Sequence, residues 1–424
     1  MKNFTLLFIS ILIFSSCEKF DDPIPDGSLL ETPTLIANLV GSDKVSLIWG
    51  SDSTCAGECP SFVPATYYEI WTRSLTSSTN YKLGETPAGE TSFLVEGLEP
   101  GVKQEFFVIA KRANFSNKTN RVMVVPNELP ASETIFEKEG FDYILYPKIS
   151  PSGEQIAYSI AQAGSNIITH NLFLYDLRSK AEKLIHENGE YPSWSASSEK
   201  LVVVSNSQNA SAIKEIEIAS GSLEEVVSDS FQNYFPVYAN ADTTLIYFLD
   251  SLEEGDQSIN SFSLSKEATN PKASLRDINA IEDGQLPLLG MDYSSEENNV
   301  AYSVTFPKET AIGFSYDVVG FALASPSALQ NLVVSDWNDS NPSFSLTDPN
   351  LLAFISDRSG LAQVWIKNVS TQQLIQVTDF QENEWINKAI VGLSWSGEKL
   401  FFNSLDVEGV TRVMSINVSS LLRN

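Results

Sequence analysis

The chain has few of the residues on which most metal-dependent and nucleic-acid-binding proteins depend. Its 424 residues include only two histidines, His170 and His186, which excludes a metal centre built from several histidines. Lys and Arg together number 27 against 54 Asp and Glu, giving a formal net charge of −27. Such a surface repels phosphate backbones, so we expect no nucleic-acid partner.

Long apolar runs and familiar catalytic motifs are also missing. The apolar run from Phe4 to Phe14 is too short to span a bilayer. The sequence has no Gly-x-Ser-x-Gly elbow, Walker loop, dinucleotide fingerprint or His-Glu-x-x-His zinc helix. Acidic residues are so numerous that a carboxylate pair for glycoside hydrolysis would give no signal. A non-enzymatic role is therefore favoured, catalysis stays open, and no catalytic residue is assigned.

The beginning of the chain has the layout of an exported protein. Lys2 precedes the apolar run, and two small residues then precede Cys17, as in a secretory signal with its cleavage site. This Ser-Ser-Cys ending resembles the lipobox of bacterial lipoproteins. The resemblance implies that residues 1–16 are a signal peptide and that Cys17 is acylated and becomes the mature N-terminus. The alternative is a secreted protein without lipid. The acidic surface offers anionic headgroups no basic patch, so attachment to a membrane would depend on the acyl chains.

Residues 17–32 are polar, acidic and proline-containing, a composition that predicts a flexible tether. The acidic cluster after Cys17 resembles the signal that sends some lipoproteins of Bacteroidetes to the cell surface. This resemblance implies an outer-membrane lipoprotein, and the side of the membrane that it faces stays open.

Two further cysteines, Cys55 and Cys59, lie close together in the sequence. In an oxidising compartment such a pair favours a disulfide that closes a small loop. The alternative is a metal site, for which two thiols provide only half of a tetrahedral shell. We therefore expect no cofactor, with Ca²⁺ left open.

From residue 33 to 126 the chain alternates apolar and polar residues in short runs, a pattern typical of a β-sandwich. Val45, Leu47 and Trp49 would share one face of a strand. The order of the segments resembles a fibronectin type III domain, with Trp49 as its core tryptophan. Gln104 stands where that family has its corner tyrosine. The resemblance implies a spacer or an adhesion module, and the spacer is favoured.

A repeat of 44 to 55 residues fills the chain from residue 132 to 424. Each copy has an apolar anchor, a turn of small or acidic residues and, seven positions after the anchor, the first apolar residue of a strand. The six pairs are Ile149 with Ile156, Trp194 with Leu201, Tyr238 with Leu245, Tyr293 with Val300, Phe344 with Leu351, and Leu393 with Leu400. This period is that of a four-stranded propeller blade, so six anchors predict six blades.

The last repeat leaves room for only three strands before the chain ends. Residues 134–136 precede the first anchor at the spacing of a fourth strand, and we predict that they complete the last blade. The repeat is clearest at residues 341–360, which resemble the WD40-like or TolB-type β-propeller. The fold class implied is all-β: a fibronectin type III sandwich followed by a six-bladed propeller closed by an N-terminal strand.

The long connections on one face of such a propeller repeatedly pair an acid with an aromatic residue. They would surround the mouth of the central channel, where rings and carboxylates can hold a sugar, a peptide amine or Ca²⁺. The candidate binding residues are Tyr191, Tyr234, Asp336, Trp337, Glu384 and Trp385. The alternative is that these rings fill gaps between blades and the acids are solvated.

Two functions follow from the sequence. The first is a non-catalytic, membrane-anchored lipoprotein whose propeller binds an envelope protein, a peptide or a glycan, with the sandwich domain as spacer. The alternative is a glycoside hydrolase or polysaccharide lyase that uses acids at the channel mouth. Two facing carboxylates at glycosidase separation would favour the enzyme. The sequence specifies neither the ligand nor the oligomeric state.

Overall fold

The computed structural model describes most of the chain. The described residues are 28–51, 62–74, 79–99, 102–126, 129–140, 142–163, 168–206, 211–228, 232–251, 256–264, 268–274, 288–307, 314–335, 337–359, 361–380 and 391–422. The proposed signal peptide, the lipidation site Cys17, the Cys55–Cys59 pair and the candidate residues Asp336, Glu384 and Trp385 lie outside them. Among the described residues, none belongs to a helix long and apolar enough to cross a membrane.

The chain divides into two compact units. The first contains most of the described residues before Val125, and the second contains Val125–Asn424 together with residues 38–46 and 96–102. Strands dominate both units, and one short helix, α1 (Ser419–Leu422), occurs in the described part of the chain. The prediction of an all-β protein is confirmed.

The first unit is built from two main sheets. One includes the run β2-β3-β7, and the other has the order β10-β8-β5-β6 with β9 also paired to β8. The strands are β2 (Pro33–Val40), β3 (Lys44–Ser51), β5 (Tyr67–Ser74), β6 (Asn80–Pro87), β7 (Ser92–Val95), β8 (Gln104–Arg112), β9 (Phe115–Lys118) and β10 (Val122–Val124). Val45, Leu47 and Trp49 alternate along β3 and are all buried, as their spacing predicted. Trp49 meets Tyr68 of the other sheet edge-on, with ring centroids 5.4 Å apart.

The first unit begins earlier than the predicted end of the tether at Thr32. β1 (Leu29–Leu30) pairs in parallel with β4 (Phe62–Val63). The side chain of Glu31 is buried, and its Oε1 accepts hydrogen bonds from the Ala65 amide at 2.9 Å and the Tyr68 hydroxyl at 2.5 Å. These bonds offset the cost of burying a carboxylate, so residues 29–31 belong to the folded unit.

The second unit contains six sets of four successively paired strands, which we call sheets 1 to 6. Sheets 1 to 3 consist of β12 (Asp142–Ile149), β13 (Gln155–Ala163), β14 (Ile168–Asp176) and β15 (Glu182–His186); β16 (Gly189–Trp194), β17 (Lys200–Asn206), β18 (Ser211–Glu217) and β19 (Leu223–Ser228); and β20 (Gln232–Ala239), β21 (Thr244–Ser251), β22 (Asp256–Ser263) and β23 (Ala268–Ser274). Sheets 4 to 6 consist of β24 (Leu288–Ser294), β25 (Asn299–Pro307), β26 (Phe314–Ala322) and β27 (Gln330–Val333); β28 (Asp339–Phe344), β29 (Leu351–Ser356), β30 (Gln363–Asn368) and β31 (Leu374–Gln376); and β32 (Leu393–Ser396), β33 (Lys399–Leu405), β34 (Thr411–Asn417) and β11 (Ser132–Lys138).

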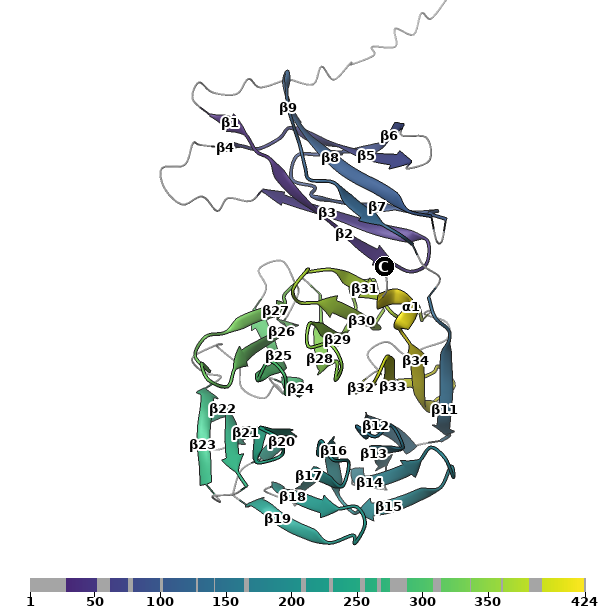
Figure 1. Cartoon of the computed structure of the whole chain (residues 1–424), viewed down its shortest axis with the longest axis vertical. Helices are drawn as coiled ribbons and strands as arrows, with labels where there is room; N and C mark the ends of the chain where they lie inside the picture. The colour runs from purple at the N-terminus through teal and green to yellow at the C-terminus, as the bar shows by residue number, and fades with distance from the viewer. Residues whose placement is uncertain are drawn as a thin grey trace, which may run out of the picture. The chain divides into compact units, whose positions relative to one another are not determined.

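The six sheets are arranged in a ring (Figure 1), the layout of a β-propeller. The first strand of each sheet is the innermost, and we call β12, β16, β20, β24, β28 and β32 the inner strands. Each inner strand contacts the inner strand of the next sheet, and β32 contacts β12. The series of sheets therefore closes on itself.

Strand β11 supplies the outermost strand of sheet 6. It pairs antiparallel with β34, from Ser132 opposite Ile416 to Lys138 opposite Thr411. This confirms the prediction that residues 134–136 complete the last sheet. Hydrogen bonds between residues far apart in the sequence then join sheet 6 to sheet 1. The side-chain amide of Asn403 donates to the Ile144 carbonyl at 3.1 Å, and the backbone amide of Ile149 donates to Ser394 Oγ at 3.0 Å.

Four of the six anchor pairs face each other across β-hairpins as predicted, and two differ. Phe344 pairs with Leu352 and not with Leu351. In sheet 6 the residue opposite Leu400 is Trp395, so Trp395 and not Leu393 is the anchor. The hairpin there has a two-residue turn that starts with Gly397 at a φ of +56°. This short turn reduces the spacing between the anchor and its partner by two residues. Trp395 then corresponds to Trp194, and both indole N–H groups donate to a backbone carbonyl of the preceding sheet.

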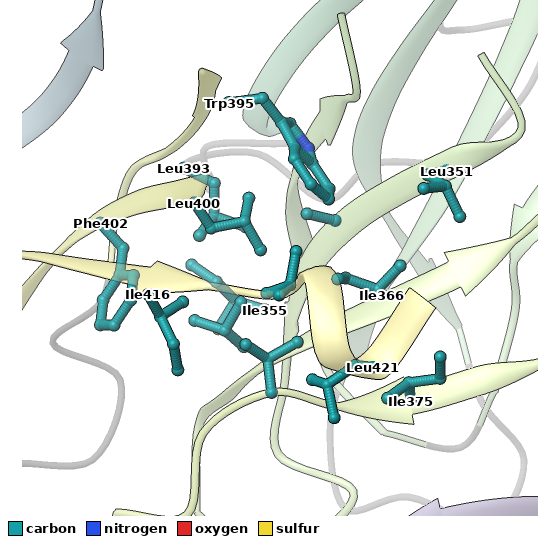
Figure 2. Close-up of a cluster of buried hydrophobic side chains, with 14 of the residues drawn as sticks. Leu351, Ile355, Ile366, Ile375, Leu393, Trp395, Leu400, Phe402, Ile416 and Leu421 are labelled. Atoms are coloured by element: carbon teal, nitrogen blue, oxygen red, sulfur yellow. The ribbon is translucent and has the colours of Figure 1, made fainter. Parts of the chain in front are cut away.

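The apolar core lies between adjacent sheets and not in one central mass. Figure 2 shows the cluster between sheets 5 and 6, where Ile355, Ile366 and Ile375 face Leu400 and Ile416. Leu421 of α1 packs against the same cluster. Each interface buries aliphatic and aromatic side chains, and this burial stabilises the fold by roughly 25 cal/mol per Å² of apolar surface. The ring is therefore stabilised by six similar interfaces.

Two buried tyrosines allow the contribution of hydrogen bonding to the stability of these interfaces to be tested. The hydroxyl of Tyr302 has no hydrogen-bond partner among the described residues, whereas Tyr238 donates to Glu215 Oε2 at 2.8 Å. We expect Tyr302→Phe to raise the free energy of unfolding by roughly 1 kcal/mol, because an unsatisfied buried group is removed. Tyr238→Phe should lower it by about 1 to 3 kcal/mol, because a bond to a charged group is lost. Urea denaturation measures both, and equal effects of the two substitutions would contradict this account.

Candidate functional site

The inner strands share a bend three residues before each anchor. We call this the axial position; it holds Tyr146, Tyr191, Phe235, Gly290, Asn341 and Gly392. The first five have φ values between +50° and +98°, in the left-handed region that bulky residues rarely adopt. The pairing register shifts at the same point in sheets 1 to 5. The inner strands of sheets 1 to 5 thus each carry a bulge that redirects one side chain, whereas Gly392 directly precedes β32.

All six axial residues line one cavity of about 30 Å³, which places them around the centre of the ring. Those of sheets 1 to 3 are aromatic and touch one another. The ring centroids of Tyr146 and Tyr191 lie 4.5 Å apart, and those of Tyr191 and Phe235 lie 4.3 Å apart. Burial raises the pKa of both tyrosines above the usual value, so they are neutral at physiological pH. One half of the channel is therefore filled with aromatic rings.

The other half has small axial residues, and its backbone is close-packed. A Cβ atom on Gly290 would lie 2.9 Å from Asn341 Cα, and one on Gly392 would lie 2.8 Å from Tyr146 Cα. These distances are too short for ordinary contact, so both positions require glycine.

Lys148 lies in the same narrow part of the channel. Its Nζ donates to the Leu393 carbonyl at 2.8 Å. Burial lowers the pKa of Lys148, and the carboxylate of Asp292 opposes that shift. Asp292 in turn accepts a hydrogen bond from the Phe344 amide at 2.8 Å. Both side chains thus link their own sheet to a neighbouring one, which is a structural role.

A larger cavity of about 180 Å³ shares Tyr146, Phe235, Asn341 and Val391 with the narrow part. We call it the mouth cavity. Its remaining lining residues are Leu289, Tyr316, Asn338, Ser340, Ile355, Asp357 and Ala362. Most of them belong to sheet 5 and the connections beside it. Aromatic walls with a few polar groups are typical of ligand sites in proteins.

Asp357 is the one acid among these lining residues. Its Oδ1 accepts the backbone amide of Asn338 at 2.8 Å, and its Oδ2 accepts the side-chain amide of the same residue at 2.7 Å. These two bonds fix the carboxylate at the end of β29 against the segment that enters β28. A fixed carboxylate beside aromatic rings can bind a cationic or hydroxyl-bearing group.

A buried ion pair supports this wall of the cavity. Arg358 Nη2 lies 2.7 Å from Asp339 Oδ1, with exposed side-chain fractions of 12% and 0%. Burial raises the pKa of Asp339, while Arg358 and the hydroxyl of Ser335, at 2.6 Å, oppose that shift. The Arg358 guanidinium also lies 5.1 Å from the Phe354 ring centroid and 5.3 Å from that of Trp365. Asp339 and Arg358 therefore position Asn338 and Asp357, which flank them in the sequence.

The structure brings only some of the sequence-predicted residues together. Tyr191 lies in the aromatic half of the channel, and Tyr234 packs against Phe235 and Phe248 beside it. Both rings pack against other aromatic rings inside the ring of sheets. Trp337 differs, because it is 49% exposed and directly precedes Asn338 of the mouth cavity. The acids are less exposed than predicted: Glu190 and Asp339 are buried within strands, and Glu190 pairs with His170.

The axial position itself was missed from the sequence, although a signal was present. Tyr146, Tyr191, Phe235 and Asn341 each precede a proline, and these dipeptides recur at the spacing of the anchors. Proline disfavours a right-handed helical conformation of the residue before it, so a repeated X-Pro step marks a repeated backbone feature. Asp357 and Tyr316 gave no comparable signal, because they become neighbours only through the packing of sheets 4 and 5.

Neither a protein-family model nor a curated protein sequence matches this chain. Solved structures that are similar to it include TolB from Acinetobacter baumannii, at 11% identity and a TM-score of 0.42 over 81% of this chain and 78% of that one. The β-propeller domain of the Trilobed protease from Pyrococcus furiosus matches at 13% identity and 0.46, over 66% and 94%. An oligogalacturonate lyase from Vibrio parahaemolyticus matches at 10% and 0.42, over 70% and 98%. At identities this low the likenesses say nothing of ligand or reaction.

Proposed function

We propose that this protein is a membrane-anchored binding protein of the bacterial envelope, which captures a protein, peptide or glycan partner at the mouth cavity. The observation that carries the proposal is the cavity itself. It combines aromatic rings, amides and a single fixed carboxylate, and it is large enough for a side chain or a sugar unit. Trp337, which directly precedes the lining residue Asn338 in the sequence, adds an exposed ring.

The finer architecture supports such a role. The six four-stranded sheets are the six blades of a propeller closed by β11, and the two sheets of the first unit form a fibronectin type III-like sandwich that acts as a spacer. The export signal and Cys17 would anchor the chain in the outer membrane, facing the periplasm or the cell surface. A tethered scaffold with its cavity on a rigid ring suits capture of a partner.

The alternative enzymatic role has less support. A glycosidase needs two carboxyl groups that flank the scissile bond. Among the described residues that line the mouth cavity, Asp357 is the one acid, and the nearby buried Asp339 is occupied by Arg358. Binding therefore accounts for the described geometry better than hydrolysis.

The test of this function is the substitution Trp337→Ala. We expect it to weaken partner capture at least tenfold, because an exposed aromatic ring beside the cavity is lost. The melting temperature should stay within about 1 °C, since the half-exposed ring contributes little to the core. The measurement is pull-down from envelope extracts, identification of the captured partner by mass spectrometry, and titration of that partner against both proteins.

Leu346→Ala serves as the matched control, because Leu346 is an equally exposed apolar residue in the hairpin between β28 and β29. Its partner affinity should equal that of the unaltered protein. A Trp337→Ala protein that captures the partner with unchanged affinity would refute the proposed surface, and a large fall in melting temperature would show that the ring belongs to the core.

A further inference from the structure

Asp357 carries a negative charge on the wall of the mouth cavity without a cationic partner in the described part of the chain. Its two hydrogen bonds come from the uncharged Asn338. The neighbouring Arg358 is directed to Asp339 instead, at 2.7 Å. A carboxylate offers about four acceptor sites, so two remain beyond those that Asn338 occupies. A charged donor in the cavity would find both a counter-charge and free acceptors.

The same cavity also has aromatic walls. Tyr146, Phe235 and Tyr316 all line the cavity. The rings of Tyr146 and Phe235 meet nearly at a right angle, with an interplanar angle of 84° and centroids 5.9 Å apart. The faces of aromatic rings attract cations electrostatically and do so most strongly where water is excluded. Rings together with a carboxylate are the elements of a cation site.

The net charge of the whole chain also favours a cationic ligand. The formal net charge of −27 concentrates cations near the surface and repels anions. At about 180 Å³ the cavity is several times larger than the roughly 30 Å³ that one water molecule occupies in the liquid. It therefore has room for an organic cation. A neutral sugar would match the size but would leave the carboxylate without a counter-charge.

We infer that the mouth cavity binds the alkylammonium end of a lysine side chain presented by a peptide segment of the partner. The ammonium group donates to Asp357, and its methylene stem lies against Tyr146, Phe235 and Tyr316. This inference rests on the proposed binding function and names the chemical class that the site recognises.

The test uses two acetylated and amidated Gly-Lys-Gly tripeptides, one with a free and one with an acetylated lysine side chain. Calorimetric titration of the complete purified protein should show saturable binding of the free lysine peptide and at least tenfold weaker binding of the acetylated one. Asp357→Asn should weaken the free peptide at least tenfold. Glu408→Gln is the control, since Glu408 is an exposed acid of the β33–β34 connection that does not line the cavity. It should change the affinity less than twofold.

Tyr316→Leu is a second variant that removes one aromatic wall and leaves the carboxylate in place. It should also weaken the lysine peptide several-fold, and it keeps the inference testable if Asp357→Asn fails to fold. Equal binding of the two peptides, no binding of either, or unchanged affinity in a folded Asp357→Asn protein would overturn the inference. Saturable binding of glucose that depends on Asp357, without binding of the lysine peptide, would overturn it in favour of a sugar site.

These outcomes separate the inference from the function on which it rests. If Trp337→Ala abolishes partner capture while the lysine peptide does not bind, the binding function stands and only the lysine preference falls. If no partner is captured in a Trp337-dependent way, the binding function itself falls.

Discussion

A chain that begins at Gly140 should form aggregates, whereas one that begins at Pro130 should elute from a sizing column as a discrete folded species. The two differ by β11, the strand that completes sheet 6. Without β11 the N–H and C=O groups on one edge of β34, between Thr411 and Ile416, lose their partners, and an unpaired strand edge is a template for pairing with other chains. The shorter chain should also unfold at a lower urea concentration.

Side chains of β11 add to this effect. Ile135 and Phe136 pack against the cluster between sheets 1 and 6, and the Phe136 ring lies 4.9 Å from that of Tyr158 and 4.3 Å from that of Tyr175. Removing the ring alone by Phe136→Ala should cost about 3 kcal/mol of stability. Equal elution and equal urea midpoints for the two truncated chains would show that the ring of sheets does not depend on β11 for closure.

The second large effect is expected at Asp339. Asp339→Asn should lower the free energy of unfolding by about 3 to 5 kcal/mol, because it leaves Arg358 charged and almost fully buried without its counter-ion. In the described part of the chain Arg358 also contacts Ser356 Oγ and aromatic rings, which do not neutralise its charge. Urea denaturation at neutral pH measures the change.

The ion pair of Glu154 with Arg178 provides the control, because its side chains are 64% and 88% exposed. Glu154→Gln should leave the unfolding midpoint unchanged within error, since water screens such pairs. The double variant Asp339→Asn with Arg358→Met should recover part of the loss, because no unpaired charge remains. A single Asp339→Asn variant as stable as the original would mean that the pair does not hold the wall of the mouth cavity.

The sequence predicted the ring of sheets because the anchors record local geometry. An anchor and the strand that follows it are joined by a short hairpin, so their spacing reports pairing directly. The errors at Phe344 and Leu393 have the same origin: one hairpin is a residue longer and another two residues shorter than the repeat, and a fixed spacing of seven does not detect this. The position of β11 followed from counting strands, which small errors in turns do not affect.

The binding surface was harder to predict, because it depends on contacts between residues distant in the sequence. Tyr191 was interpreted as a loop residue, but the bulge of β16 directs it into the channel. The acids of the long connections were expected at the channel mouth, but strand formation buries Glu190 and Asp339. Trp337 was identified because it belongs to one of the acid–aromatic pairs that recur in the long connections. Asp357 lies in a run that reads as an ordinary turn, and only the packing of Tyr316 and Asn338 around it makes it notable.

The axial residues divide the ring into two halves. In one half the side chains can be replaced by smaller ones, and in the other half no larger side chain fits. At Gly290 and Gly392 there is no space for a methyl group, because the next inner strand is too close. Larger side chains at these two positions therefore cannot be used to narrow the channel. Tyr146, Tyr191 and Phe235 share the positive φ of Gly290 but carry large side chains, and exchanging them for smaller ones would widen the passage without rebuilding a sheet. The diameter of the axial opening is thus adjustable at three residues, two of which, Tyr146 and Phe235, also line the mouth cavity.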